Sequence, residues 1–130
     1  MTYLFNQPSA FAAELIEGFV AANADKVRQV SGGVVRSTRS QPDTVAVIVG
    51  GGSGHYPAFA GLVGQGLAHG AAMGNLFASP SAQQIYNVAR ARITARVCCC
   101  CLETMPVTCC ILVRRASGCA LRVLPVRCWR

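Results

Sequence analysis

Residues 44–55 read TVAVIVGGGSGH, and this stretch decides the fold class. Thr44 to Val49 form an unbroken run in which every residue except Ala46 is β-branched. Such a run is typical of a strand that is buried on both faces, as in a parallel sheet. The glycines that follow end the strand and predict a glycine-rich loop that reaches His55.

Upstream of this strand, apolar residues recur three and four positions apart over residues 9–24. This spacing predicts an amphipathic helix, and Pro8 suits its first turn. Residues 25–43 are mostly polar and carry turn chemistry at Gly32-Gly33, with a short strand expected near Val34–Val35.

Downstream of the loop, apolar residues over positions 59–67 predict a second helix, which three glycines weaken. A short strand is expected over Ala71–Met73. Ser79 is the expected N-cap of a third helix, with Pro80 at its first position and an apolar stripe over residues 85–89. The order helix, strand, glycine loop, helix, strand, helix predicts an α/β fold.

Charge and cysteine are distributed very unevenly along the chain of 130 residues. Its 12 basic and 5 acidic residues give a net charge of +7, and it has 8 cysteines. Residues 1–91 carry a net charge of only +1, whereas residues 92–130 hold seven arginines and one acid. All the cysteines lie between Cys98 and Cys128. The first 91 residues are therefore neither a disulfide scaffold nor a basic nucleic-acid module.

The chain has no Lys, Arg, Asp or Glu between Thr44 and Ala89. Glycines, amides and His55 interrupt this segment, so we interpret it as a buried α/β interior rather than a membrane span. The first eight residues lack the basic and apolar regions of a secretory signal. We therefore expect a cytoplasmic protein, in which cysteines stay reduced.

The glycine loop is a candidate binding site. Glycines let backbone N–H groups approach a ligand, and open α/β sheets bind ligands at the carboxyl ends of their strands. The loop lacks the Gly-Lys-Ser/Thr end of a phosphate-binding loop and the glycine spacing of a dinucleotide fingerprint. His55 adds an imidazole suited to proton transfer near neutral pH. Spacing alone leaves open whether His55 binds a ligand or only caps the next helix or packs under the loop, and His69 has no partner motif.

Residues Val47–Gly66, VIVGGGSGHYPAFAGLVGQG, resemble the substrate loop of the dihydroxyacetone kinase K domain, which reads GGGSGHEP followed by an AHAGFVG-type sequence. Asn6-x-Pro8 and the segment Glu17–Phe19 resemble the N-terminal helix of that family. Residues 72–81, AMGNLFASPS, resemble its G-x-x-F-x-S-P-S segment. The resemblance covers about residues 3–91, with the motifs in the family's order.

The resemblance implies an α/β fold, an incomplete N-terminal part of the K-type domain, with an irregular C-terminal tail. It implies phosphoryl transfer to the terminal hydroxyl of dihydroxyacetone or a related short ketose. Gly52, Ser53, Gly54 and His55 match the residues that contact the substrate, and His55 matches the catalytic general base or hydrogen-bond partner. Tyr56 stands where bacterial dihydroxyacetone kinases usually have Glu, and GHYP resembles relatives that act on four-carbon ketoses such as erythrulose.

The same resemblance implies partners for this part of the protein. A separate L domain or subunit would carry ATP or ADP with magnesium, and the intact family forms homodimers. A phosphotransfer system stays open as the alternative donor. We expect no cofactor or metal on this part, and neither a nucleic acid nor a membrane as partner.

The tail departs from the family, which continues with a G-N-Y-x-G-D motif. Back-translated codons, taken one base earlier, turn Cys99, Cys100 and Cys101 into leucines and Pro106 into alanine. They also permit Gly-Asn-Tyr-Ala-Gly-Asp across this segment. We therefore predict that residues 1–91 belong to the K domain and that residues 92–130 are an out-of-frame tail without a domain. A loose strand is expected across Val97–Leu102, and the chain as written is expected to be inactive.

Two other functions remain open at this point. A non-catalytic ketose-binding or regulatory module would use the same loop. A small metal or nucleic-acid protein would use the tail, where Cys98 and Cys101 have C-x-x-C spacing. The tail has no turn glycine between these cysteines and no aromatic residues among its arginines except Trp129, so this function ranks last.

Overall fold

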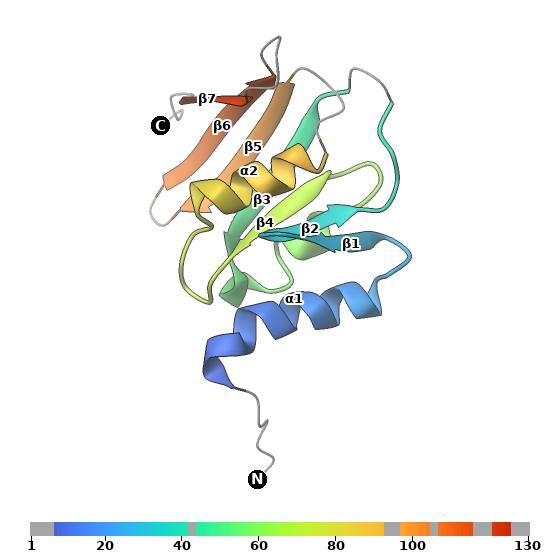
Figure 1. Ribbon diagram of the computed structural model, residues 1–130, viewed down its shortest axis with the longest axis vertical. Helices are drawn as coiled ribbons and strands as arrows, with labels where there is room; N and C mark the ends of the chain where they lie inside the picture. The colour runs from blue at the N-terminus through green and yellow to red at the C-terminus, as the bar shows by residue number, and fades with distance from the viewer. Residues whose placement is uncertain (1–6, 42–43, 93–96, 105–106, 116–120, 126–130) are drawn as a thin grey trace.

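The computed structural model describes residues 7–41, 44–92, 97–104, 107–115 and 121–125. Strands form one sheet in the order β1-β2-β4-β3-β5-β6-β7, with helices packed on it (Figure 1). The strands are β1 (Val27–Val30), β2 (Gly33–Arg36), β3 (Ala46–Gly52), β4 (Gly70–Gly74), β5 (Val97–Thr104), β6 (Val107–Arg115) and β7 (Leu121–Pro125). The α-helices are α1 (Phe11–Ala22) and α2 (Ala82–Arg90). Neither of them has the length and apolar character needed to cross a membrane.

The strand predicted from residues 44–49 is β3, at the centre of the sheet. It pairs in parallel with β4 on one side and with β5 on the other, and its residues are buried or half-buried. The remaining pairs of neighbouring strands are antiparallel. The α/β class and the parallel burial of this strand are confirmed.

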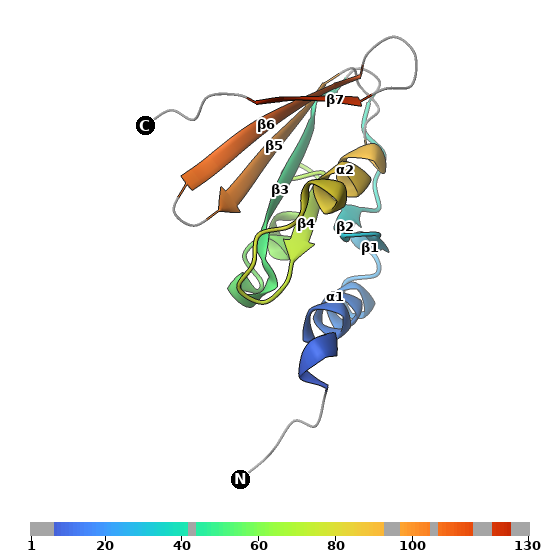
Figure 2. The same ribbon diagram turned by 60° about the vertical axis from the view of Figure 1, so that its left-hand side comes forward.

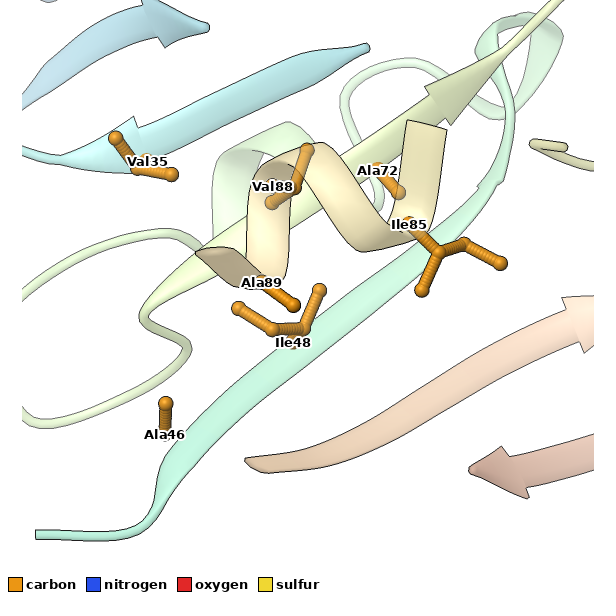
Figure 3. Packing of buried hydrophobic residues seen from close by; sticks show 7 residues of the cluster. All are labelled: Val35, Ala46, Ile48, Ala72, Ile85, Val88 and Ala89. Carbon is orange, nitrogen blue, oxygen red and sulfur yellow. The ribbon is translucent and has the colours of Figure 1, made fainter. Parts of the chain in front are cut away.

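One hydrophobic core lies between α2 and the sheet. Ile85, Val88 and Ala89 of α2 point toward strand residues that include the fully buried Ile48 (Figure 3). Val35 of β2 and Ala72 of β4 belong to the same cluster, together with Ala46. The predicted stripe over residues 85–89 is therefore the face that α2 buries.

A second core lies on the opposite face of the sheet. Val34, Ala71 and Met73 pack there with the short 3₁₀ helix Ala60–Leu62. The helix α1 has no fully buried residue, and its half-buried side chains Ile16, Phe19 and Val20 pack at the edge of this cluster. Alternate residues of β2 and β4 thus supply two cores, because successive strand side chains point to opposite faces. In Figure 2, α2 lies beside β4 and α1 lies below β1.

The predicted helix over residues 59–67 was wrong. The segment between β3 and β4 contains only the 3₁₀ helices Ser53–His55 and Ala60–Leu62, followed by turns. Glycines disfavour helix, and Gly66 has a φ of 87°, which an α-helix does not contain. The predicted strand near Val34–Val35 is confirmed as β2, whereas β1 was missed because it has only two apolar residues, Val27 and Val30, within a mostly polar segment.

The tail contains more regular backbone than the sequence predicted. The expected strand across Val97–Leu102 is confirmed as β5, but β6 and β7 extend the sheet beyond it. β-branched and apolar residues favour extended backbone. The edge of β3 that does not pair with β4 has unpaired main-chain groups, to which an extended segment can hydrogen-bond. The structure thus gives three strands in a segment where the sequence predicted one loose strand. Asn6 and residues 93–96, 105–106, 116–120 and 126–130 lie outside the described residues.

The N-cap of α2 is Ser81 rather than the predicted Ser79. The Gln84 N–H donates to Ser81 Oγ at 3.3 Å, and the Ser81 N–H donates to Gln84 Oε1 at 2.8 Å. This reciprocal pair is a capping box, which requires a Glu or Gln three residues after the cap. Ser79 is followed at that distance by Ala82, so it cannot form one.

We predict that Ser81→Ala lowers the free energy of unfolding by about 1 kcal/mol, because the first turn of α2 loses its cap. Urea unfolding followed by circular dichroism measures this change. Ser79→Ala is the matched control and should change it by less than about 0.5 kcal/mol. Equal losses in the two variants would contradict the assignment of the cap.

Candidate functional site

The glycine loop and the turn after β4 lie side by side at the carboxyl ends of β3 and β4. The two strands run in register as far as the pair Gly52 and Gly74. Beyond this pair, the Ser53 N–H donates to the Asn75 carbonyl at 3.1 Å, and the Gly54 N–H donates to the Leu76 carbonyl at 2.7 Å. The two segments that carry the family resemblance are thus joined by main-chain hydrogen bonds.

Two glycines of the loop, Gly52 and Gly54, lie close to this turn, whereas Gly51 lies against the Phe59 ring. A Cβ atom on Gly52 would lie 3.0 Å from the Leu76 carbonyl oxygen, and one on Gly54 would lie 2.5 Å from the same atom. The sequence predicted that the glycines open N–H groups to a ligand, but the amides of Ser53 and Gly54 are already bonded to the turn. No α-helix lies between the loop and β4 either.

His55 is exposed at the end of the 3₁₀ helix Ser53–His55. Its ring meets Phe59 edge-on, with centroids 5.9 Å apart and an interplanar angle of 80°. Within the described part of the chain the imidazole makes no hydrogen bond. The helix-capping alternative for His55 fails because no α-helix follows, and both ring nitrogens remain available to a ligand.

Ser53 contributes a hydroxyl of a different kind. Its side chain is fully buried, and its Oγ has no hydrogen-bond partner among the described residues. A buried hydroxyl without a partner is uncommon, since it forfeits its hydrogen bonds to water. The site therefore combines an exposed imidazole with an unpaired hydroxyl, and the surrounding segment from Thr44 to Ala89 carries no formal charge. In the described ranges, no three His, Cys, Asp or Glu side chains gather as they would around a metal ion.

Tyr56 connects the loop to the N-terminal helix. Its ring meets Phe19 of α1 edge-on at a centroid distance of 6.0 Å, while half of the tyrosine stays exposed. The residue that departs from the dihydroxyacetone kinase pattern is therefore both next to His55 and in contact with α1.

His69 is the polar residue that sequence analysis undervalued. It is buried at the start of β4, and its Nδ1 accepts the Val47 N–H at 3.1 Å. Burial lowers the pKa of His69, and the charges of Arg36 and Arg92 lower it further. Its position in a turn gave no spacing signal, because the partner is a main-chain group 22 residues away.

Comparison with known proteins decides the family. The Dak1 domain model matches residues 17–101, which is more than half of the chain. The chain therefore belongs to the dihydroxyacetone kinase (Dak1) family. The resemblance seen in the sequence is confirmed, and the family is one of kinases.

Two similar curated relatives are erythrulose kinases. L-erythrulose kinase of Pectobacterium atrosepticum is 86% identical over 91 residues, which cover 70% of this chain and 15% of that protein. L-erythrulose 1-kinase of Mycolicibacterium smegmatis is 58% identical over 90 residues, which cover 69% of this chain and 16% of that protein. The chain thus spans about a sixth of the length of these relatives.

Solved structures of the family share the fold. Dihydroxyacetone kinase from C. freundii in complex with AMP-PNP and Mg²⁺ matches with a TM-score of 0.65 and 33% identity, covering 75% of this chain and 19% of that one. The dihydroxyacetone kinase operon co-activator DhaQ matches with a TM-score of 0.54 and 32% identity, covering 60% of this chain and 24% of that one.

We predict that Gly54→Ala separates the loop from the turn after β4, because its Cβ would clash with the Leu76 carbonyl. Hydrogen exchange should show at least a tenfold faster exchange of the Ser53 amide, which corresponds to about 1.4 kcal/mol. Gly64→Ala is the matched control, since a Cβ there meets nothing within 4 Å. If Gly54→Ala leaves this exchange unchanged, the glycine is not required by the contact.

Proposed function

We propose that this chain is the ketose-binding part of a kinase that phosphorylates the terminal hydroxyl of dihydroxyacetone or a related short ketose. The observation that carries the proposal is the pair of polar groups at the carboxyl ends of β3 and β4. The exposed imidazole of His55 and the buried, unpaired hydroxyl of Ser53 lie two residues apart on one 3₁₀ helix. A small ketose is uncharged and rich in oxygen, so neutral donors and acceptors suit it.

Each residue of the loop has a role in this proposal. Gly52, Ser53 and Gly54 would hold the ketose, and His55 would accept a hydrogen bond from the reacting hydroxyl or take up its proton as general base. The turn at Asn75 fixes the loop, which reduces the freedom that binding must remove.

Phosphoryl transfer requires charge stabilisation that this segment does not supply. The transferred group carries negative charge, which Mg²⁺ and cationic side chains usually offset. Residues 44–89 contain no Lys or Arg. We therefore propose that ATP or ADP with magnesium sits on a separate L domain or subunit, and that the chain alone does not turn over substrate. From the family resemblance we also propose that the intact protein is a homodimer.

Erythrulose is the more specific candidate for the ketose. Both erythrulose kinases compared above are more than half identical to this chain over the matched segment. Tyr56 supports the same choice, because a neutral ring beside His55 suits a longer uncharged substrate better than a carboxylate would. Dihydroxyacetone remains the reference ketose of the family.

We predict that His55→Ala weakens the binding of erythrulose by about fivefold, because one hydrogen bond to the ketose is worth roughly 1 kcal/mol. Calorimetric titration of the full chain with erythrulose and with dihydroxyacetone measures the two affinities. Gln65→Ala, an exposed polar change in the same connection, is the control and should leave both unchanged. Equal affinity of the His55→Ala variant and the unmodified chain would refute the role of His55.

A non-catalytic regulatory module is the second candidate function. The structural match to the co-activator DhaQ favours it, because that protein is described as an activator of an operon. Supplying an L subunit with ATP and magnesium separates the two functions: a ketose that is bound but never phosphorylated, even after the reading frame is restored, indicates a regulatory module.

We also propose that the native domain sequence ends at residue 91 and that residues 92–130 are translated out of frame. The 86% identical match covers 91 residues, the length of the segment assigned to the K domain. The Dak1 match runs ten residues further, to residue 101, where β5 occupies the free edge of β3. A strand of apolar residues can be placed there even if its sequence was not selected for the position.

Arg92 supports the break at this point. It is 7% exposed, and its Nε and Nη2 atoms have no hydrogen-bond partner in the part of the chain that the structure describes. Burial lowers the pKa of Arg92, as do the neighbouring charges of Arg28 and Arg36. A guanidinium buried among like charges costs free energy, which is the opposite of what selection for the fold would produce.

We predict that Arg92→Ala raises the free energy of unfolding by about 1–3 kcal/mol, because it removes unsatisfied buried donors. Thermal and urea unfolding measure the change. Arg90→Ala, at an exposed position in the last turn of α2, is the control and should lower stability slightly. A destabilising Arg92→Ala, or gene sequence with an intact frame around codons 88–92 and no GNYAGD in the shifted frame, would refute the break.

A further inference from the structure

A histidine closes the parallel ladder of β3 and β4 at the end opposite the candidate site. The His69 N–H donates to the Val47 carbonyl at 2.8 Å, and the Val47 N–H donates to His69 Nδ1 at 3.1 Å. We call this pair of bonds the Val47–His69 clasp. The first bond continues the ladder, whereas the second uses a side chain where a strand carbonyl would ordinarily accept.

The side chain is needed because the main chain before His69 turns away from β3. The Ala68 N–H donates to the Leu62 carbonyl, and the Ala68 carbonyl accepts the Gly64 N–H, each at 3.1 Å. The backbone of Ala68 is therefore engaged with the preceding turn. Without the imidazole, the half-buried Val47 N–H would lose its partner, which main-chain groups in sheets rarely tolerate.

The same ladder ends in the candidate site. From the Val47–His69 clasp the register runs without interruption to Gly52 and Gly74 and then into the bonds of Ser53 and Gly54 with the turn. Because strands are stiff and the pairing is continuous, the relative position of β3 and β4 at one end sets their relative position at the other.

We propose that His69 is a positioning residue whose neutral imidazole, by accepting the Val47 N–H, aligns β3 with β4 and so holds the loop of His55 against the turn of Asn75. The link to ketose affinity rests on the proposed function, whereas the Val47–His69 clasp does not.

The charges around His69 make this clasp sensitive to acid. Accepting a hydrogen bond at Nδ1 requires that the proton of the neutral ring lie on Nε2. Two described charged groups act on the ring, those of Arg36 in β2 and Arg92 after α2. The main-chain N–H of Arg36 also donates to the His69 carbonyl. Both are cations, so a second proton on the ring would remove the acceptor and add a third positive charge.

The direction of the pH effect follows from the lowered pKa. When the Val47–His69 clasp is open, the pKa of His69 is near its ordinary value of 6.5. When the clasp is formed, the pKa of His69 lies below that value. The opened state therefore takes up a proton first as the pH falls. The clasp is fully formed above about pH 6.5 and weakens by up to tenfold per pH unit below it, until the pKa of the closed state is reached.

Nuclear magnetic resonance on the unmodified full chain tests the clasp directly and needs no ketose. We expect the ¹⁵N shifts of His69 to report an unprotonated Nδ1 and a protonated Nε2 at pH 7.5, with a pKa below that of free histidine. We also expect the protection factor of the Val47 amide to fall several-fold between pH 7 and pH 5. A proton on Nδ1, or a pKa at or above 6.5, overturns the proposal.

Two variants separate positioning from simple packing. His69→Asn keeps an acceptor and cannot titrate, so the Val47 amide should stay protected and lose its pH dependence. His69→Leu keeps the bulk and removes the acceptor, so the Val47 and Gly54 amides should both exchange about tenfold faster at pH 7. If His69→Leu leaves both amides protected, or His69→Asn keeps the pH dependence, the positioning role is excluded.

Ketose affinity gives the last comparison. Erythrulose binding should weaken between pH 7 and pH 5 in the unmodified chain and less so in His69→Asn, with His55 present in both. If no ketose binds at any pH, the proposed function fails while the exchange data still decide the clasp. If ketose affinity is equal in the unmodified chain, His69→Asn and His69→Leu across this range, the link from His69 to the loop is wrong.

Discussion

The parallel pairing of β3 with β4 is the constraint on which the rest of this structure depends. Both cores use it, because alternate residues of the two strands face α2 on one side and the 3₁₀ segment with α1 on the other. Its carboxyl end carries the loop and turn of the candidate site, and its amino end is closed by His69. A displacement of one strand along the other would disturb the cores and the site together.

The glycines of the candidate site show how one residue type can serve a different purpose from the one its pattern suggests. A glycine-rich loop after a strand commonly leaves its amides open to a ligand. Here Gly52 and Gly54 allow the main chain to pass close to the Leu76 carbonyl, and the Ser53 and Gly54 amides are bonded to the turn. Of the loop's polar side chains, the imidazole of His55 is exposed, whereas the Ser53 hydroxyl is buried without a partner among the described residues.

The unequal distribution of charge has a structural counterpart. The first 91 residues are nearly neutral, and their described polar side chains are mostly exposed or bonded. The neutral His69 and the cations Arg36 and Arg92 depart from this, since each of these side chains is buried with an unpaired nitrogen in the described region, and Ser53 is buried with an unpaired hydroxyl. Arg36 retains a bond from Nη2 to Ser40, and His69 retains the Val47–His69 clasp. Arg92 is the one of the three that lies in the segment for which we propose translation out of frame.

The sequence by itself determined the central strand, the loop with His55, the helix stripe over residues 85–89 and the α/β class. Each of these rests on a local pattern of apolar residues or glycines, and local patterns survive in any context that buries them. The helix predicted over residues 59–67 was wrong, because the glycines there favour turns. The N-cap predicted at Ser79 was wrong, because Ser81 is the serine that pairs with Gln84.

Only the tertiary structure decided which groups meet. The sequence separates Gly54 from Leu76 by 22 positions, and Val47 from His69 by the same number, with no spacing rule to connect them. Their contacts arise because β3 and β4 run parallel, which requires a long connection and brings distant main-chain groups into line. A hydrogen bond from a main-chain N–H to a side chain leaves no pattern in the sequence. Every residue except proline carries a main-chain N–H, so the donor cannot be recognised by its residue type.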